Sequence, residues 1–237
     1  MLIELIKFLK KWGNIKMDSV LVVYVYTKHK EYCRHLYPKT FESLTYKNKL
    51  AAFIDEKDYK KLRDMPTGEQ RAAAGRQIGI DIAKEKKVDW IFFLDLDCEP
   101  DADIIEKLLA VKHPIVGGLH AARGNAFHII GHNYKNRKTL EREWLKRSDV
   151  DKNQYCDGIS GGTLLVAKGI FNKVDYTGYQ GPNTIAGRYT ADDEYLLIQV
   201  YKKMKIRPKV CSNAYSWHYH EDGRAYKLFG KIKVWKA

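Results

Sequence analysis

The most apolar run of the chain ends in two acidic residues. Residues 88–94 read Val-Asp-Trp-Ile-Phe-Phe-Leu, and Asp95-Leu96-Asp97 follows directly. A short run rich in β-branched and aromatic residues predicts a buried strand, and alternate residues of an extended chain face the same way, so both carboxylates can approach one cation. Open α/β sheets bind ligands at the carboxyl ends of their strands, where carboxylate oxygens suit Mg²⁺ or Mn²⁺. The run therefore predicts a divalent metal that bridges a diphosphate substrate.

Strand-like apolar runs alternate with helix-like segments along the chain. Strands are expected over these residues: 20–26, 49–54, 88–94, 114–119, 163–166 and 210–220. Helices are expected over these residues: 31–43, 71–86, 104–111, 140–151 and 192–203. The segment that leads from the fourth strand to Asn136 is basic and is expected to be irregular. Strands that alternate with helices predict an α/β fold, and the first strand is expected to belong to a parallel sheet.

The length and composition suit one large domain with short appendages. The chain has 237 residues, of which 45% are hydrophobic, and this is enough for a sizeable core. We expect the main domain over residues 17–222, a basic tail over 223–237 and an amphipathic helix over 1–16. This helix either packs on the domain or lies on an anionic membrane surface through residues 1–12, and the sequence leaves both alternatives open.

The charge balance favours anionic partners. Lys and Arg total 42 against 29 Asp and Glu, which gives a formal net charge of +13. Such a field attracts nucleotides, nucleic acids or acidic lipid surfaces without choosing among them. The four cysteines show no metal-ligand spacing and favour a reduced, cytoplasmic protein. No apolar run reaches the roughly 18 residues that a membrane-spanning helix needs, so membrane contact is expected to be peripheral.

Further polar groups follow the acidic triplet in the second half of the chain. Asp192-Asp193 opens a predicted helix, where acids also act simply as caps and partners of the helix dipole. His218 and His220 lie two residues apart on a predicted strand, so both can face the same side and either can reach a metal. Gly161-Gly162 lets the backbone approach a ligand closely.

In this order the segments resemble the GT-A class of nucleotide-sugar glycosyltransferases, especially its family-2-like members. The resemblance covers most of the chain, from about Val20 to His220. It rests on the following elements: the first strand, Arg71 and Arg76 before Ile78-Gly79, Phe92-Phe93-Leu94 with the Asp-x-Asp (DxD) triplet, Val116-Gly117-Gly118-Leu119, Cys156-Asp157-Gly158, Gly161-Gly162-Thr163, Asp192-Asp193 and His218. The resemblance implies a GT-A-like, Rossmann-type mixed sheet, mainly parallel and flanked by helices, with residues 17–222 as the catalytic domain.

The resemblance also implies metal and nucleotide ligands. Asp97 would ligate the divalent cation, and Asp95 would contact the nucleotide ribose or a metal-bound water. His218 looks like the distal metal ligand of the family, with His220 as the alternative. Arg71 and Arg76 would contact the base or the phosphates, although both could instead belong to a solvated basic helix face.

The remaining implied roles concern the sugar and the acceptor. Arg123 belongs to a segment that looks like the donor-side loop of the family and could meet a phosphate. Gly161 and Gly162 would shape the sugar pocket. Asp193 matches the catalytic acid of the family, whereas Asp192 stands where the family usually has Glu, which leaves the assignment between these neighbours less secure.

The function predicted from these residues is an inverting, metal-dependent transfer of a sugar, in the hexosyltransferase class, from a nucleotide diphosphate donor such as a UDP- or GDP-sugar. Asp193 would remove the proton from the acceptor hydroxyl. The acceptor and the donor sugar are not specified by the motifs. Two alternatives are a nucleotidyltransferase, which also uses paired acids and a cation, and a non-enzymatic basic nucleic-acid-binding protein.

Overall fold

The fold is a mixed α/β arrangement, seen in a computed structural model that describes residues 17–122, 125–181 and 190–235. The strands of the main sheet are β1 (Val20–Tyr26), β2 (Lys49–Asp55), β3 (Trp90–Leu94), β5 (Ile115–Leu119), β12 (Thr163–Ala167), β13 (Lys209–Tyr219), β14 (Arg224–Lys227) and β15 (Lys231–Val234), with β4 (Cys98–Pro100) and β10 (Gln154–Tyr155) paired to β13. Two smaller sheets contain β6 (Ala121–Ala122), β7 (Asn125–Ile129), β8 (Gly131–Asn136), β9 (Glu141–Trp144) and β11 (Gly158–Ile159). The α-helices are α2 (Leu36–Ser43), α3 (Lys60–Arg63), α4 (Gly68–Lys86), α5 (Ile104–Ala110), α6 (Lys168–Phe171) and α7 (Asp192–Met204), and the 3₁₀ helices are η1 (Lys28–Cys33) and η2 (Arg147–Asp149).

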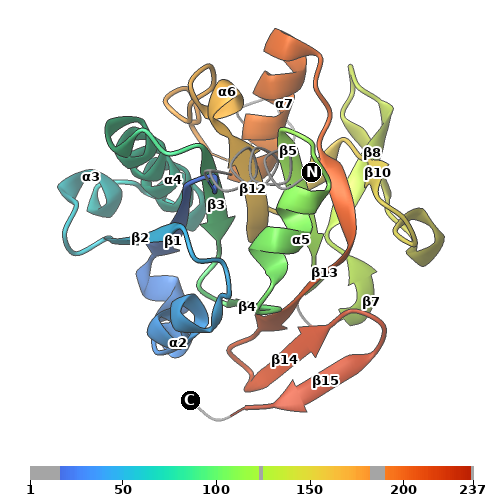
Figure 1. The fold of residues 1–237 in the computed structure, drawn as a ribbon, viewed down its shortest axis with the longest axis horizontal. Helices are drawn as coiled ribbons and strands as arrows, with labels where there is room; N and C mark the ends of the chain where they lie inside the picture. The colour runs from blue at the N-terminus through green and yellow to red at the C-terminus, as the bar shows by residue number, and fades with distance from the viewer. Residues whose placement is uncertain (1–16, 123–124, 182–189, 236–237) are drawn as a thin grey trace, which may run out of the picture.

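The main sheet has the strand order β15-β14-β13-β5-β12-β3-β1-β2 (Figure 1). Parallel pairing joins β1 to β2, β1 to β3, and β5 to β13. The strand β12 lies antiparallel between β3 and β5, and β14 and β15 extend the sheet as an antiparallel hairpin. The predicted mixed α/β sheet is confirmed, but its pairing is less parallel than the sequence pattern indicated.

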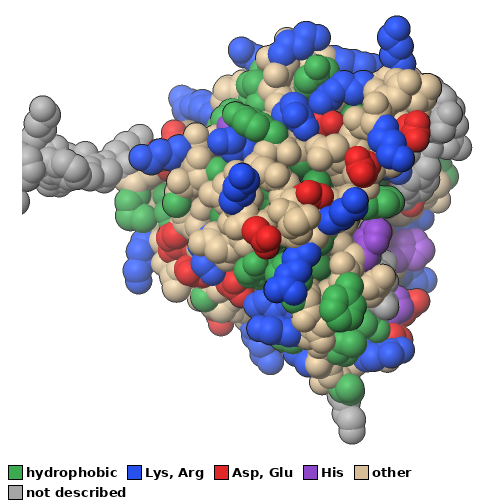
Figure 2. Space-filling view, turned by 90° about the vertical axis from the view of Figure 1, so that its right-hand side faces the viewer, with side chains coloured by type: hydrophobic (Ala, Val, Ile, Leu, Met, Phe, Trp, Pro, Cys, Tyr) green, Lys and Arg blue, Asp and Glu red, His purple; other side chains and the backbone are tan. Residues whose placement is uncertain are grey.

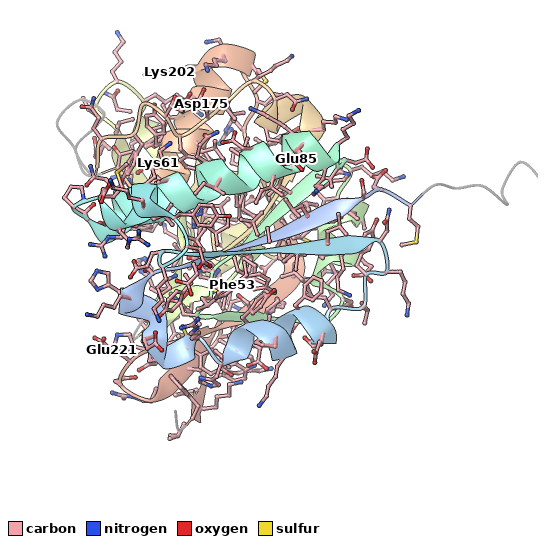
Figure 3. All side chains as sticks on the ribbon, turned by 90° about the vertical axis from the view of Figure 1, so that its left-hand side faces the viewer. Phe53, Lys61, Glu85, Asp175, Lys202 and Glu221 are labelled. Atoms are coloured by element: carbon pink, nitrogen blue, oxygen red, sulfur yellow. The ribbon has the colours of Figure 1, made fainter. Side chains whose placement is uncertain are left out.

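Two hydrophobic cores lie on opposite faces of the sheet. Alternate residues of β1 divide between them: Leu21 and Val23 join the core beneath α4, whereas Val22 and Tyr24 join the core on the side of α2 and α5. This division follows from the two-residue period of a strand that is buried on both faces. Figure 3 shows α4 and α2 on opposite sides of β1 and β2, with the labelled Phe53 on β2.

Several predicted elements match the structure closely. The expected strands at 20–26, 49–54, 114–119, 163–166 and 210–220 correspond to β1, β2, β5, β12 and β13, and the expected helices at 71–86, 104–111 and 192–203 to α4, α5 and α7. The helix expected over 31–43 is divided into η1 and α2, and Pro38 is the third residue of α2, within the first turn, where a missing backbone N–H costs little.

Three predictions for the second half of the chain are wrong. The segment 140–151 is not a single helix, because β9 pairs with β8 before the short η2 begins, and such tertiary pairing overrides a weak local preference. The segment before Asn136 contains β6, β7 and β8 and is not irregular. The predicted tail over 223–237 contains β14 and β15, which continue the main sheet from β13. The helix predicted over 1–16 lies outside the described residues.

Candidate functional site

The acidic triplet lies at the carboxyl edge of the sheet. The parallel neighbours β1 and β3 both end there, and Asp95-Leu96-Asp97 follows β3 directly. The backbone N–H of Asp95 donates to the Gly162 carbonyl at 3.1 Å, which fixes the triplet against the residue that precedes β12. Asp97 is fully buried, whereas Asp95 is partly exposed. The predicted position of the two acids, at the end of a buried strand, is confirmed.

A lysine ammonium lies between the two carboxylates. Lys30 Nζ lies 2.8 Å from Asp97 Oδ1 and 3.3 Å from Asp95 Oδ2. Burial acts to lower the pKa of Lys30, but the adjacent Asp95 and Asp97 outweigh it and hold this pKa above its usual range. The two acids therefore share a cation, as their spacing predicted, and in this structure that cation belongs to the chain itself.

Arg76 on α4 connects the triplet to the acidic pair at the start of α7. Its guanidinium lies 2.9 Å from Asp95 Oδ1 and also pairs with the Asp192 carboxylate. Burial acts to raise the pKa of Asp95, but Lys30 and Arg76 together lower it to about 2, so this carboxylate stays ionised. Arg76 thus brings together two acidic motifs that lie far apart in the sequence.

Asp192 and Asp193 are held differently. Burial raises the pKa of Asp192 to about 6 even though Arg76 pairs with it. The Asp193 carboxylate accepts the backbone N–H groups of Gly161 and Glu194, each at 2.7 Å. Burial also raises the pKa of Asp193, against the opposing effect of Arg76. Asp193 is therefore a carboxylate without a side-chain ion pair in its printed contacts, and it is a stronger base than an exposed Asp.

Gly161 permits this close packing. A Cβ atom at Gly161 would lie 2.8 Å from the guanidinium carbon of Arg76 and 2.9 Å from the Asp193 Cβ. A Cβ atom at Gly162 would lie 3.1 Å from the His120 ring and 3.2 Å from the Cys98 sulfur. Both glycines therefore allow the backbone to pass between functional side chains, in line with the close approach expected of them.

Two cavities meet the acidic pair. One cavity, of about 410 Å³, is lined by Lys30, Arg76, Asp95 and Asp192 together with Thr27 and His29, and is called the Lys30 cavity below. A second cavity, of about 190 Å³, is lined by Asp193 and Glu194 together with His132, Arg142, Trp144 and Ser160, and is called the Trp144 cavity. Consecutive residues at the start of α7 thus line different cavities.

Within the described residues, Asp97, Cys98 and His218 form a buried group that could hold a metal ion, with one ligand atom of each within 4.8 Å of the others. His218 Nδ1 lies 2.8 Å from the Ala121 carbonyl, which can only accept, so Nδ1 carries a proton and Nε2 faces Asp97 Oδ2 at 3.5 Å. A backbone carbonyl often fixes a ligating imidazole in this way. The carboxylate and imidazole donors suit Mn²⁺ better than Mg²⁺, which prefers oxygen ligands, and the Cys98 thiol would favour a softer ion.

The structure assigns different positions to the two candidate histidines. His218 belongs to the metal-competent group, whereas His220 Nδ1 lies 3.1 Å from Asp222 Oδ1 in the turn before β14. The prediction of His220 as a metal ligand is therefore wrong, because β13 ends at Tyr219 and the two-residue alternation does not continue past it. Asp95 is likewise absent from the metal-competent group, since Lys30 and Arg76 occupy its two oxygens.

The predicted arginines also separate. Arg76 lines the Lys30 cavity, whereas Arg71 donates from Nε to the Met65 carbonyl at 3.0 Å and lies 3.5 Å from the His29 ring, which lines that cavity. Arg71 is therefore an outer neighbour of the cavity. Arg123 lies outside the described residues.

The sequence reasoning missed Lys30 and Trp144. Lys30 lies four residues after β1, at the sheet edge where Asp95 also emerges, so the parallel pairing of the two predicted strands was a usable signal. Trp144 was assigned to a helix, and only its pairing opposite His132 in β8 brings it to the cavity near Asp193. That pairing joins separate segments and leaves no local pattern.

Basic side chains do not gather in a single patch on the face shown in Figure 2. Lys and Arg are spread over that face with Asp and Glu among them. Among the described residues, no helix is both long enough and apolar enough to cross a membrane.

Comparison with known proteins identifies a shared fold. No protein-family model and no curated protein matches the chain. Among solved structures, the chain is similar to the crystal structure of A197 from STIV, with a TM-score of 0.61 and 13% sequence identity over 92% of this chain and 95% of that one. At this identity the similarity concerns the fold alone, and it extends over nearly the whole of both chains.

Proposed function

We propose that this protein is a metal-dependent, inverting glycosyltransferase that moves a sugar from a nucleotide diphosphate donor, such as a UDP- or GDP-sugar, to an acceptor hydroxyl. The observation that carries the proposal is the bridge made by Arg76 between Asp95, at the end of β3, and Asp192, at the start of α7. This bridge holds a candidate donor-binding acid and a candidate catalytic pair around one point. The GT-A-like character of the fold is part of the same proposal.

The Lys30 cavity suits the donor. Its lining contains the cationic groups of Lys30 and Arg76, which attract a diphosphate, and the Asp95 carboxylate, which can accept hydrogen bonds from ribose hydroxyls. Its volume of about 410 Å³ falls within the range of roughly 300–1,000 Å³ usual for small-molecule sites. A diphosphate in this cavity would compete with Asp95 and Asp97 for the Lys30 ammonium.

Asp193 is the proposed base. It takes the proton from the acceptor hydroxyl, and the freed oxygen forms a bond to the anomeric carbon. The bond from that carbon to the diphosphate oxygen breaks, and the nucleoside diphosphate leaves with the electron pair. Asp192 is less suited to this role because its carboxylate is paired with Arg76. Asp192 instead orients Arg76 toward the donor side.

Asp97 and His218 would hold the divalent cation, with Mn²⁺ the better match to an oxygen and nitrogen donor pair. When bound, such an ion supplies positive charge that stabilises the departing diphosphate. Around it, Tyr32 donates its hydroxyl toward Asp97 Oδ2 at 3.4 Å, and Lys30 binds Oδ1, so the chain fixes the carboxylate that faces the ion.

Removal of the metal ligand should weaken donor binding. Replacing Asp97 with Asn keeps the side-chain shape and removes the negative charge, so we expect nucleoside diphosphate affinity in the presence of Mn²⁺ to fall at least about tenfold, as it does when even outer partners of metal ligands are lost. Isothermal titration calorimetry with UDP and GDP measures this change. Asp103→Asn is the matched control, because Asp103 is about half exposed and remote in its contacts. Equal affinity in Mn²⁺ and in chelator would contradict the metal assignment.

Turnover should fall at acidic pH. The base must be ionised, and burial raises the pKa of Asp193 above its ordinary value of 3.8, so protonation begins at a higher pH than for an exposed Asp. We therefore expect kcat to decrease as the pH falls, with an acid limb above 4. A kcat profile measured at saturating donor and acceptor checks this. A profile that stays flat down to about pH 4 would exclude a buried carboxylate as the base.

The function itself is tested with a panel of nucleotide sugars, incubated with the full chain and Mn²⁺ and analysed for released products. A glycosyltransferase releases nucleoside diphosphate, including slow hydrolysis without an acceptor. A nucleotidyltransferase supplied with nucleoside triphosphate and sugar phosphate releases pyrophosphate instead. Release of nucleoside diphosphate supports the proposal, and its absence across the panel, with or without acceptors, counts against it.

A further inference from the structure

We propose that the Trp144 cavity is the acceptor site and that the acceptor is a carbohydrate whose terminal sugar ring lies against Trp144. This inference rests on the proposed function, because it takes the donor to lie in the Lys30 cavity. In an inverting transfer the acceptor oxygen approaches the anomeric carbon from the side opposite the diphosphate. The acceptor therefore needs a separate entrance that reaches the base, and the Trp144 cavity is the one that Asp193 lines.

The cavity is built by elements outside the main sheet. The small sheet β11-β8-β9 supplies Gly158, His132 and Trp144, and α7 supplies Asp193 and Glu194. The Gly158 backbone passes so close to the His132 ring that a Cβ atom there would lie 2.1 Å from the ring. The cavity wall is thus a packed surface that faces the catalytic end of α7.

Trp144 presents an oriented aromatic face. Its side chain is 46% exposed, although it is a large hydrophobic residue. Its ring makes edge contacts with His128 and His132, at centroid distances of 4.9 and 5.7 Å, and these contacts restrict its orientation. An exposed but oriented indole is suited to the apolar C–H face of a sugar ring, because aromatic side chains offer a broad apolar surface at low entropy cost.

The polar wall suits neutral hydroxyl groups. Glu194 is fixed by Tyr134, by Arg142 Nε at 3.1 Å and by His132 Nε2 at 3.1 Å. Together with Ser160, these residues present both hydrogen-bond donors and acceptors, and sugar hydroxyls need both. An anionic group, such as a phosphate of nucleic acid or lipid, would instead face the two carboxylates of Asp193 and Glu194 against the single guanidinium of Arg142.

The size of the cavity points to a single ring. Its volume of about 190 Å³ lies below the range of roughly 300–1,000 Å³ that accommodates drug-sized ligands. A nucleotide would not fit, whereas one sugar unit would, with the rest of the acceptor extending past Trp144 into solvent. The cavity therefore selects a terminal sugar rather than an extended chain.

The test is binding of methyl glycosides of common hexoses and N-acetylhexosamines to the full chain, with UDP or GDP and Mn²⁺ present, followed by saturation-transfer NMR. We expect at least one glycoside to bind, Trp144→Ala to weaken that binding at least tenfold, and Trp144→Phe to retain most of it. Tyr155→Ala is the matched control, because Tyr155 is similarly exposed, at 50%, but lines a different cavity. Circular dichroism verifies that each variant is folded.

The possible failures can be told apart. If the wild-type protein releases nucleoside diphosphate from a nucleotide sugar and binds no glycoside, or if Trp144→Ala binds glycosides as tightly as wild type, the acceptor inference is overturned and the proposed function stands. If glycosides bind through Trp144 but no nucleotide binds, the proposed function fails. The acceptor role then fails with it.

Discussion

Replacing Asp193 with Asn should lower kcat by about 10²- to 10⁴-fold, the contribution usual for a positioned general base. The substitution keeps the shape of the side chain and leaves an oxygen to accept the Gly161 N–H, which lies 2.7 Å from the native carboxylate. Donor affinity should change little, because Asp193 lines the Trp144 cavity rather than the Lys30 cavity. Steady-state turnover of the donor sugar, together with calorimetric nucleoside diphosphate binding, measures both quantities.

The neighbouring acid provides the contrast for this experiment. Asp192→Asn removes the charge that pairs with Arg76 and should mainly weaken donor binding. Asp175→Asn is the exposed control, because Asp175 contacts Thr177 in a surface turn. If Asp192→Asn abolished turnover while Asp193→Asn turned over at nearly the wild-type rate, the base would be Asp192 and the two roles would be reversed.

Replacing Arg76 with Met should cost about 3–5 kcal/mol of unfolding free energy, the usual result of removing one partner from a buried ion pair. The Arg76 side chain is 6% exposed, and its two partners are Asp95 and Asp192. Without the guanidinium, the Asp192 carboxylate would be left buried beside Asp193 with no compensating charge. Chemical denaturation followed by circular dichroism measures the loss.

Arg71→Met is the matched control on the same helix. Arg71 is more exposed, and its printed side-chain ion pair is a long one, 3.8 Å to Glu56. A more exposed pair of this kind contributes about 0–1 kcal/mol. An Arg76→Met variant as stable as Arg71→Met would mean that Arg76 does not compensate the acids, and the proposed link between the two motifs would be lost.

The parts of the fold that the sequence predicted are those with strong local patterns. The runs that form β1 and β3 are buried on both faces, so their continuous apolar character was sufficient to identify them. The helix α4 begins with a capping box in which Thr67 and Gln70 cap each other, a signal that lies within four residues. Asp95 and Asp97 could be predicted because they follow directly from such a strand.

The parts that were not predicted depend on contacts between distant segments. The residues of β9 are mostly charged and gain their extended conformation from pairing with β8. The hairpin β14-β15 likewise exists through its pairing with β13. Lys30 reaches Asp97 by a long side chain from a 3₁₀ segment, so its role depends on geometry that a single sequence does not encode locally. The choice between His218 and His220 required the end of β13 to be known.

The central claim is that the acids after β3 and the imidazole of His218 form one site for a divalent cation and a nucleoside diphosphate. The most direct measurement is a crystal structure of the full chain soaked with Mn²⁺ and UDP or GDP, with anomalous data collected for manganese. We predict an anomalous peak between Asp97 and His218, with the diphosphate beside it and the nucleoside in the Lys30 cavity. Nucleotide bound elsewhere, with the Lys30 ammonium still between Asp95 and Asp97 and no manganese at His218, would contradict the account.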